Sequence, residues 1–410
     1  MGAGLRACRG SLDGRIVYAD HAATSWPKPP PVARAMVDYL EQAGANPGRS
    51  AHRLAVAAAR AVFATRQAVA RFLGCSHEAR IVFGPNATWG INLALYGLLE
   101  PGDHVVTSTV EHNAVARPLY DLRARGVDVT RVRCSPEGHL DLDDLRRALG
   151  RRTRLVVLTH ASNVTGTILP VAAAARLAHE EGALVLVDAA QTAGCLPLDV
   201  TGMDLDLVAF TGHKALLGPQ GTGGLYIREG ISPRPLVRGG TGSLSHLEEQ
   251  PDLLPDVYES GTLNGVGLAG LGAAVRYLAD VGTDAVRQHE LGLASRLLDG
   301  LRDIPGVRVH GPPDAQARVA LVSFTVAGAD PARVGELLDS DFGVMVRTGL
   351  HCAPWAHRTA GTYPAGTVRI SLGYSNTLEE VDYVVSAVAR VAARLRRERP
   401  GGRGWTACSG

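Results

Sequence analysis

The sequence predicts an α/β fold in which a large domain with a mainly parallel sheet is followed by a smaller α+β domain. In the middle of the chain, short apolar runs alternate with amphipathic stretches, which is typical of parallel strands covered by helices on both faces. In the last third, strands and helices follow in a different, α+β pattern. With 410 residues, 46% of them hydrophobic and 20% charged, the chain can bury a large core.

The large domain is predicted over residues 27–280. Five apolar runs are interpreted as its buried strands: Val105–Thr109, Leu155–Thr159, Leu184–Val187, Leu207–Phe210 and Gly224–Ile227. Helical patterns lie between several of these strands, at Asp141–Leu149 and Val171–Glu181. Because helices separate the strands, the pattern favours a sheet that is mainly parallel.

The smaller domain is predicted over residues 281–398. Gly282 to Asp284 interrupts a helical region, so that Val275–Asp280 and Ala285–Leu301 form either one long helix or two linked ones. The strands expected next are Val307–His310, Ala320–Val326 and Val368–Leu372, and the helices are Pro331–Asp339 and Leu378–Arg396. Residues 1–26 are expected to form an N-terminal segment that packs with the small domain. The Gly-rich tail 399–410 is expected to be disordered.

Composition excludes several classes of function. The net charge of +2 gives no electrostatic case for binding nucleic acid. No apolar run approaches the roughly 20 residues of a membrane span, and the first residues lack the apolar core of a secretory signal. The six cysteines are scattered without a CxxC pair, which is typical of reduced thiols. We therefore expect a cytoplasmic protein and predict no metal site.

Lysine is rare in this chain. Of the 42 basic residues, only Lys28 and Lys214 are lysines, and the others are arginines. Lys28 lies in a Pro-rich extended segment and is interpreted as solvated. Lys214 follows the strand Leu207–Phe210, where catalytic groups of open α/β sheets gather. It is therefore either a surface lysine or an amine that forms a Schiff base.

Other polar residues follow the predicted strands. Asp188 ends an apolar run and either caps a helix or pairs with the protonated ring nitrogen of pyridoxal phosphate. Gly84–Thr88 precedes an amphipathic run and either caps that helix or binds a phosphate. His112 either stacks on a ring and moves protons or is structural. Asn163 offers an amide to a phenolic oxygen or a carboxylate. Together these strand ends predict one site.

The C-terminal domain adds two candidates. Arg369 lies on a predicted strand and either binds a substrate carboxylate through two hydrogen bonds or forms a structural ion pair. Cys352 lies in a loop with His351 and Arg347, which are expected to lower the pKa of its thiol and favour the thiolate. The alternative is a buried, inert cysteine, which suits Cys75 and Cys195 better.

These segments together resemble the class V aminotransferase family, a fold-type I group of pyridoxal phosphate enzymes. Within it they are similar to the cysteine desulfurase and selenocysteine lyase branch, over about Tyr18 to Leu372. The motifs that carry the resemblance are Asp20-His-Ala-Ala-Thr-Ser, Asn46-Pro-Gly-Arg-Ser-Ala-His52, Asn86-Ala-Thr88, Glu111-His112-Asn113, Ser162-Asn163, Asp188-Ala-Ala-Gln191, Thr211-Gly-His-Lys214, Glu259-Ser-Gly-Thr-Leu-Asn264, Arg347–Pro354 and Val368-Arg369-Ile-Ser-Leu. The resemblance implies a seven-stranded type of sheet in the large domain.

The resemblance also implies roles for individual residues. Lys214 would hold pyridoxal 5'-phosphate as a Schiff base, Asp188 would pair with the ring nitrogen, and His112 would stack on the ring. Arg369 would bind the substrate carboxylate, beside Asn163 and Arg347, and Cys352 would attack sulfur. The remaining cofactor residues implied are Ala87, Thr88, Asn163, Gln191, Thr211, His213 and, from a second subunit of a homodimer, Thr262.

The implied activity is that of a cysteine desulfurase. L-Cysteine would become L-alanine, and the sulfur would remain on Cys352 as a persulfide before passing to an acceptor, which could be a protein. Leu350 stands where a housekeeping desulfurase tends to carry a second His, which leaves the physiological substrate open. A selenocysteine lyase or another C–S lyase is therefore the alternative, as is, from another class, a cofactor-free scaffold for sulfur transfer.

Overall fold

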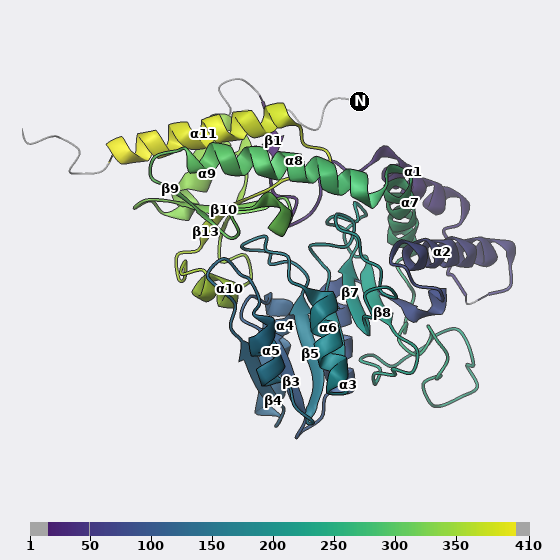
Figure 1. Ribbon diagram of the computed structural model, residues 1–410. Helices are drawn as coiled ribbons and strands as arrows, with labels where there is room; N and C mark the ends of the chain where they lie inside the picture. The colour runs from purple at the N-terminus through teal and green to yellow at the C-terminus, as the bar shows by residue number, and fades with distance from the viewer. Residues whose placement is uncertain (1–14, 49, 399–410) are drawn as a thin grey trace, which may run out of the picture.

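The computed structural model describes residues 15–48 and 50–398. Two sheets organise the fold (Figure 1). A seven-stranded sheet with its helices forms the larger, lower part of the view, and a four-stranded sheet with its helices lies above it. The chain begins in the upper part, continues through the larger part, and returns to the upper part for its C-terminal third.

The seven-stranded sheet is mainly parallel. Its strands follow the order β2-β8-β7-β6-β5-β3-β4, and β8 alone runs antiparallel to its neighbours. The bounds of these strands are β2 Ile81–Gly84, β3 His104–Ser108, β4 Asp128–Val132, β5 Thr153–Thr159, β6 Leu184–Asp188, β7 Leu207–Thr211 and β8 Gly223–Ile227. The predicted fold class and all five predicted strands are thus confirmed, and β2 and β4 are additions at its two edges.

Helices cover both faces of this sheet, because its strands are apolar on both sides. One face packs against α3 (Ala87–Leu98) and α4 (Asn113–Ala124). The other packs against α5 (Leu142–Ala148), α6 (Val171–Glu180) and α7 (Gly265–Val281). Alternate residues of one strand serve opposite cores: Leu155 and Val157 face α3 and α4, whereas Val156 faces the other side.

The strand order reverses between β3 and β5. From β3 the chain passes outward to β4, and it then returns to β5 on the other side of β3. The carboxyl ends of parallel strands at such a reversal frame a crevice that binds ligands. His112 follows β3, Asn163 follows β5, Asp188 ends β6 and Lys214 follows β7. The topology therefore brings the four predicted strand ends to one edge of the sheet.

Two N-terminal helices, α1 (Pro30–Gln42) and α2 (Arg53–Phe72), pack along α7. The glycines of α7 make this close approach possible. A Cβ on Gly272 would lie 2.3 Å from the hydroxyl oxygen of Thr65, and one on Gly270 would lie 2.8 Å from Cγ of Met36. Any larger residue at these two positions would push the helices apart.

The four-stranded sheet is antiparallel, in the order β12-β13-β10-β9. Helices α8 (Thr283–Arg302), α9 (Pro331–Phe342) and α11 (Leu378–Arg397) share its apolar core and lie on its side away from the seven-stranded sheet (Figure 1). The remaining bounds are β1 Val17–Tyr18, β9 Val307–His310, β10 Leu321–Val326, β11 Val344–Met345, β12 Arg347–Gly349, α10 Pro354–Thr359 and β13 Thr367–Ser371, with short 3-10 turns at Glu78–Arg80 and Ala315–Ala317.

Two features concern the predicted boundaries. Gly282 adopts φ 87° and separates α7 from α8, so the helical region that the sequence left open is two helices.

Within the described N-terminal segment, β1 pairs in parallel with β11 of the C-terminal part. The segment then crosses to the large sheet, where Ser25 N donates to the carbonyl of His213. The predicted tail 399–410 lies outside the described residues.

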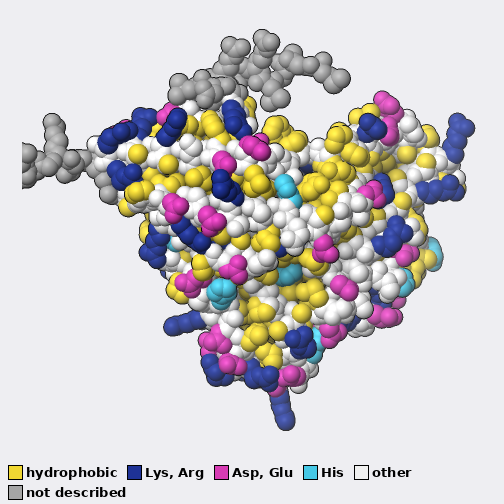
Figure 2. All heavy atoms as spheres, turned by 45° about the horizontal axis from the view of Figure 1, so that its top comes forward, with side chains coloured by type: hydrophobic (Ala, Val, Ile, Leu, Met, Phe, Trp, Pro, Cys, Tyr) yellow, Lys and Arg dark blue, Asp and Glu magenta, His cyan; other side chains and the backbone are white. Residues whose placement is uncertain are grey.

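Among residues 15–48 and 50–398, no helix is long and apolar enough to cross a membrane. The face that carries α8 and α11 has basic side chains scattered among Asp and Glu (Figure 2), and the basic residues of these two helices are arginines and histidines. No continuous basic surface is seen on this face.

Candidate active site

A pocket lies at the carboxyl edge of the seven-stranded sheet and brings together nine of the ten predicted cofactor residues. Its lining includes Ala87, Thr88, His112, Asn163, Asp188, Gln191, Thr211, His213 and Lys214. These residues come from the first turn of α3 and from the loops or ends of β3, β5, β6 and β7. The tenth, Thr262, lies elsewhere on this chain, where its hydroxyl accepts a hydrogen bond of 3.3 Å from Asn46.

Lys214 follows β7 in a tight turn, in which Leu217 N donates to the carbonyl of Lys214. Burial lowers the pKa of Lys214 from 10.5 to about 8, and the positive charges of Arg369 and Arg347 act in the same direction. The negative charge of Asp188 opposes this effect. A much larger fraction of Lys214 is therefore a neutral, nucleophilic amine at neutral pH than for a solvated lysine.

Asp188 ends β6 and is buried. Its Oδ1 accepts a hydrogen bond of 2.9 Å from Ala190 N, while Oδ2 has no hydrogen-bond partner among the described residues. Burial raises its pKa, and the charge of Lys214 opposes that rise. A cation in the pocket would stabilise the ionised carboxylate, which is the environment that a protonated ring nitrogen provides.

Polar groups that suit an anion gather at the start of α3. Asn86 caps the helix by accepting from Trp89 N at 3.0 Å, which leaves the hydroxyl of Thr88 and the first backbone amides of α3 for a ligand. Buried nearby, Thr211 Oγ1 and His213 Nδ1 have no hydrogen-bond partner among the described residues. Buried polar atoms without partners are costly, so this set fits the phosphate of pyridoxal 5'-phosphate.

The residues expected around the cofactor ring also have structural contacts. His112 caps α4 by accepting from Ala114 N at 3.0 Å, and burial lowers its pKa to about 4, so its ring is neutral. Asn163 Nδ2 donates to the carbonyl of His351 at 2.7 Å, and its Oδ1 is buried without a partner. Gln191 Nε2 donates to the carbonyl of Ala22 at 3.2 Å. His112 thus has the structural role of capping α4, and it also lines the pocket.

Glu111 is a supporting residue to which sequence reasoning gave no role. Its buried carboxyl accepts from the hydroxyl of Ser108 at 2.5 Å and from Thr159 N at 2.8 Å. These bonds join the ends of β3 and β5 beneath the pocket. Burial raises its pKa to about 8. The signal in the sequence was its place beside His112, directly after a buried strand.

Cys352 lies in the turn between β12 and α10 and is exposed, whereas Cys75 and Cys195 are buried as predicted. His351 and Cys352 both adopt left-handed backbone conformations, with φ of 47° and 56°, which cost energy for residues with a side chain. Asn113 N donates to the carbonyl of Cys352 at 2.8 Å. Arg347 Nη2 lies 3.6 Å from the sulfur. Cys352 lines a groove that shares Thr88, His112 and Ala114 with the Lys214 pocket.

The predicted effect of His351 on the thiol is wrong. Its ring is buried, Nε2 shares a hydrogen bond of 3.0 Å with Thr367 Oγ1, and burial lowers its pKa to about 2. A neutral ring that points into the protein supplies no positive charge to stabilise a thiolate. Arg347 is the cation at Cys352, since its guanidinium is the group near the sulfur.

Arg369 is fully buried on β13. It forms an ion pair of 2.8 Å with Asp20, and Nη1 donates to the carbonyl of Asn163 at 3.1 Å. Its Nε has no hydrogen-bond partner among the described residues. The structural ion pair is thus present, and Nε is the donor still available.

The prediction of a solvated Lys28 is also wrong. Its ammonium donates to Ser25 Oγ at 2.7 Å and to the carbonyl of His213 at 2.9 Å. The sequence signal, a Pro-rich extended segment, correctly excluded a helix at Lys28. It did not show that the segment folds back onto the residue before Lys214.

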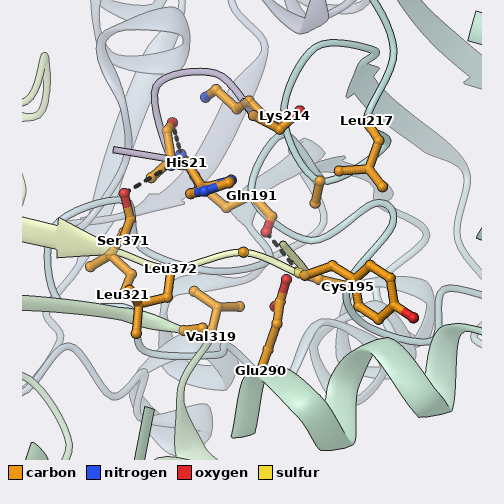
Figure 3. Close-up of a pocket in the computed structure, with 16 residues that line it drawn as sticks. His21, Gln191, Cys195, Lys214, Leu217, Glu290, Val319, Leu321, Ser371 and Leu372 are labelled. Carbon is orange, nitrogen blue, oxygen red and sulfur yellow. Dashed lines mark hydrogen bonds between the residues drawn. The ribbon is translucent and has the colours of Figure 1, made fainter. Parts of the chain in front are cut away.

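A second cavity borders Lys214 and Gln191 at the junction of the two sheets (Figure 3). His21, Cys195 and the buried carboxyl of Glu290 also line it. Burial raises the pKa of Glu290 to about 8, so that its carboxyl is mostly neutral at pH 7.

A lysine, a buried aspartate and polar groups without partners thus lie together at one edge of the large sheet. The family profile described as "Aminotransferase class-V" matches residues 17–384. The chain therefore belongs to the class-V aminotransferase family, which implies use of pyridoxal phosphate.

Individual relatives place it in the cysteine desulfurase branch. A protein from Methanothermobacter thermautotrophicus named "Probable cysteine desulfurase" is 38% identical over 383 residues, covering 92% of this chain and 94% of that one. The apo structure of a cysteine desulfurase from Thermococcus onnurineus matches with a TM-score of 0.86 at 34% identity, covering 92% and 95%. The cysteine desulfurase CsdA from Escherichia coli matches with a TM-score of 0.82 at 32% identity, covering 92% and 94%.

Proposed function

We propose that this protein is a pyridoxal phosphate-dependent cysteine desulfurase that converts L-cysteine to L-alanine and takes the sulfur onto Cys352. One observation carries the proposal. Cys352, with the Arg347 guanidinium beside its sulfur, lines a groove that shares residues with the Lys214 pocket. A thiol there can reach the sulfur of an amino acid whose α-carbon lies at Lys214.

The residues present fit the cofactor. Thr88, Thr211 and His213 would hold its phosphate with the amides of α3, Asp188 would face its ring nitrogen, and Lys214 would hold its aldehyde carbon. When bound, pyridoxal phosphate withdraws electrons from the α-carbon of an amino acid and so lowers the barrier to removal of the α-proton.

Lys214 and Arg369 would then handle the substrate. The substrate carboxylate would bind at Arg369 through Nε, the donor without a partner. Nζ of Lys214 takes the α-proton, a role supported by its lowered pKa of about 8. The neutral ring of His112 would pack over the site without adding charge.

Cys352 would carry the sulfur step. Its thiolate attacks the substrate sulfur, an S–S bond forms as the C–S bond breaks, and the electron pair of the C–S bond remains with the carbon fragment. That fragment takes up one proton at Cβ, regains a proton at Cα from Nζ of Lys214 and leaves as alanine. Arg347 would help to orient the sulfur, since its Nη2 lies 3.6 Å from Sγ of Cys352.

A dimer with shared sites is part of the proposal. Thr262 lies outside the Lys214 pocket of its own chain, as expected if it reaches the phosphate of a second copy. Val37 and Leu40 on α1 and Phe63 on α2 are large apolar residues that remain exposed in one chain. Their burial against a second copy would stabilise such a dimer.

The test is product release from L-cysteine, with dithiothreitol present to reduce the persulfide, by the wild type, Cys352→Ala and the control Cys75→Ala, with cofactor absorbance recorded in each sample. We expect alanine and sulfide from the wild type and the control, and almost no alanine from Cys352→Ala with its absorbance retained. Equal alanine release from Cys352→Ala would contradict the persulfide step. It would redirect the search to selenocysteine and other C–S substrates.

A further inference from the structure

The two lysines of the chain meet at one peptide group. Lys214 follows His213, and the carbonyl oxygen of His213 accepts the ammonium of Lys28 at 2.9 Å. The sequence separates these lysines by more than 180 residues, and every other basic residue except histidine is an arginine. Nothing in the proposed function uses Lys28.

The His213 carbonyl is surrounded by donors from one segment. Besides Lys28, the hydroxyls of Thr24 and Ser25 lie 3.0 and 3.2 Å away, and Ser25 N donates at 2.9 Å. A carbonyl oxygen has two lone pairs, so four donors at one oxygen are more than a backbone carbonyl ordinarily accepts. We call residues 20–28 the clamp segment, because they hold this peptide group from one side.

The clamp segment also contacts two other residues of the site. At its start, Asp20 pairs with Arg369 at 2.8 Å, and the carbonyl of Ala22 accepts from Gln191. Figure 3 draws His21 of this segment and Lys214 at the same cavity. Arg369, Gln191 and the Lys214 peptide are thereby joined by nine consecutive residues, and Lys28 makes the last of these contacts.

Composition indicates that position 28 requires an ammonium. Forty of the 42 basic residues are arginine, so a basic residue whose side chain only faces water would be expected to be arginine here. At position 214 a lysine is expected in place of arginine, because only an amine can form a Schiff base. At Lys28 a compact ammonium fits between Ser25 Oγ and the His213 carbonyl, whereas a planar guanidinium is larger and donates in a fixed fork.

We propose that Lys28 is a positioning residue for Lys214, and that its ammonium, bound to the His213 carbonyl, fixes the peptide from which the Lys214 side chain extends. Leu217 N holds the next carbonyl, that of Lys214, on the far side of the residue. Because the backbone is held on both sides, Nζ returns to one position each time it takes or gives a proton. Partial burial, which lowers the pKa of Lys28 to about 8, accords with an ammonium removed from bulk water.

The catalytic part of this inference rests on the proposed function, so its test has two arms. The variants are Lys28→Met, which removes the ammonium, and Lys28→Arg, which keeps the charge. Arg34→Met is the matched control, since Arg34 is an exposed cation on the neighbouring helix α1. Thermal unfolding of all four proteins establishes that each variant folds.

The first arm needs neither activity nor cofactor. The apoprotein is acetylated with acetic anhydride, and peptide mass spectrometry follows Lys28 and Lys214, the only two lysine amines present. We expect Lys214 to react several-fold faster in Lys28→Met than in the wild type or Arg34→Met.

The second arm measures turnover of L-cysteine by the holoenzyme. We expect kcat to fall about tenfold in both Lys28→Met and Lys28→Arg, with KM within twofold of the wild type. Contacts that only stabilise the fold would not lower kcat in variants that remain folded, and a purely electrostatic role would be rescued by arginine.

Each outcome decides the proposal. Reactivity of Lys214 in Lys28→Met equal to that in the wild type would overturn it. Wild-type kcat in either variant would also overturn it. If the wild type forms no alanine from L-cysteine, the proposed function fails, and the acetylation arm still decides whether Lys28 holds the Lys214 peptide.

Discussion

The Lys214 pocket and the Cys352 turn present two kinds of reactive site in one molecule. In the pocket, Asp188 is buried at the end of β6 and the half-buried Lys214 follows the adjacent parallel strand β7, where a rigid sheet sets their separation. In the turn, Cys352 is exposed on a left-handed backbone. Its main-chain link to the large part of the fold is the bond from Asn113 N.

Because of this difference, substitutions in the pocket and in the turn should affect different steps of the reaction. Changes in the pocket alter charges in a buried setting, where unpaired groups are expensive, and should affect every reaction of the cofactor. Changes in the turn should affect sulfur transfer alone.

The largest effect is expected from Lys214→Ala. Removing the amine eliminates both the covalent attachment of the cofactor and the base, so alanine release should fall by at least about 10³-fold. The visible absorbance of the purified protein should change as well. Normal absorbance in the variant would show that Lys28 or another amine holds the cofactor.

Asp188→Asn is expected to have the next largest effect. The amide matches the carboxylate in shape but leaves a ring cation unpaired, so kcat should fall about 100-fold while the protein remains folded. Absorbance titrated against pH would detect the lost pairing as a lower pKa of the bound cofactor. An unchanged titration would mean that Asp188 serves only as the turn cap seen at Ala190 N.

The histidines beneath the Cys352 turn make stability depend on pH. Burial lowers the pKa of His357 to about 4, with help from His310 and Arg369. Because the folded pKa lies below the ordinary 6.5, neutral His357 contributes fully to the free energy of unfolding above pH 6.5, and this contribution is lost as pH falls toward 4. At pH 5 the contribution of His357 is smaller than at pH 8 by about 2 kcal/mol.

Thermal or urea unfolding between pH 8 and pH 5 measures this loss. His357→Asn should be less sensitive to acid by about that amount, although its stability at pH 8 falls through loss of the bond to Thr362. His139→Asn, at an exposed site, is the control. An acid response in His357→Asn equal to that of the wild type would mean that His357 is already charged in the folded state.

Arg347→Met is expected to have the smallest effect, and it distinguishes the Cys352 turn from the Lys214 pocket most clearly. Loss of the guanidinium that lies 3.6 Å from the sulfur should slow alkylation of Cys352 by iodoacetamide at pH 7 by no more than about threefold, since the contact is exposed to solvent, while cofactor absorbance is unchanged. Arg347 also contributes to the lowered pKa of Lys214, so the absorbance titration is the essential control. A large shift there would assign Arg347 to the pocket instead of the turn.

Much of the pocket could be predicted from the sequence, because strand ends are visible as the last residues of apolar runs. The apolar runs ending at Val187 and Phe210 placed Asp188 at the end of β6 and Lys214 three residues beyond the end of β7. Parallel pairing then requires these ends to share one edge, so local sequence was enough.

The remaining features depend on contacts between distant segments. The direction of the His351 ring depends on a left-handed backbone and on Thr367 of another strand. The partners of Lys28 lie at Ser25 and at His213, far along the chain. No periodicity records such pairings.

The most direct test of a shared reaction between pocket and turn is a single turnover without reductant. The holoenzyme is mixed with one equivalent of L-cysteine, and alanine and the mass of the Cys352 peptide are measured in the same sample. One alanine per chain and the added mass of one sulfur atom on Cys352 are predicted. Alanine without added sulfur on that peptide would contradict the proposal that the two sites act in sequence on one substrate.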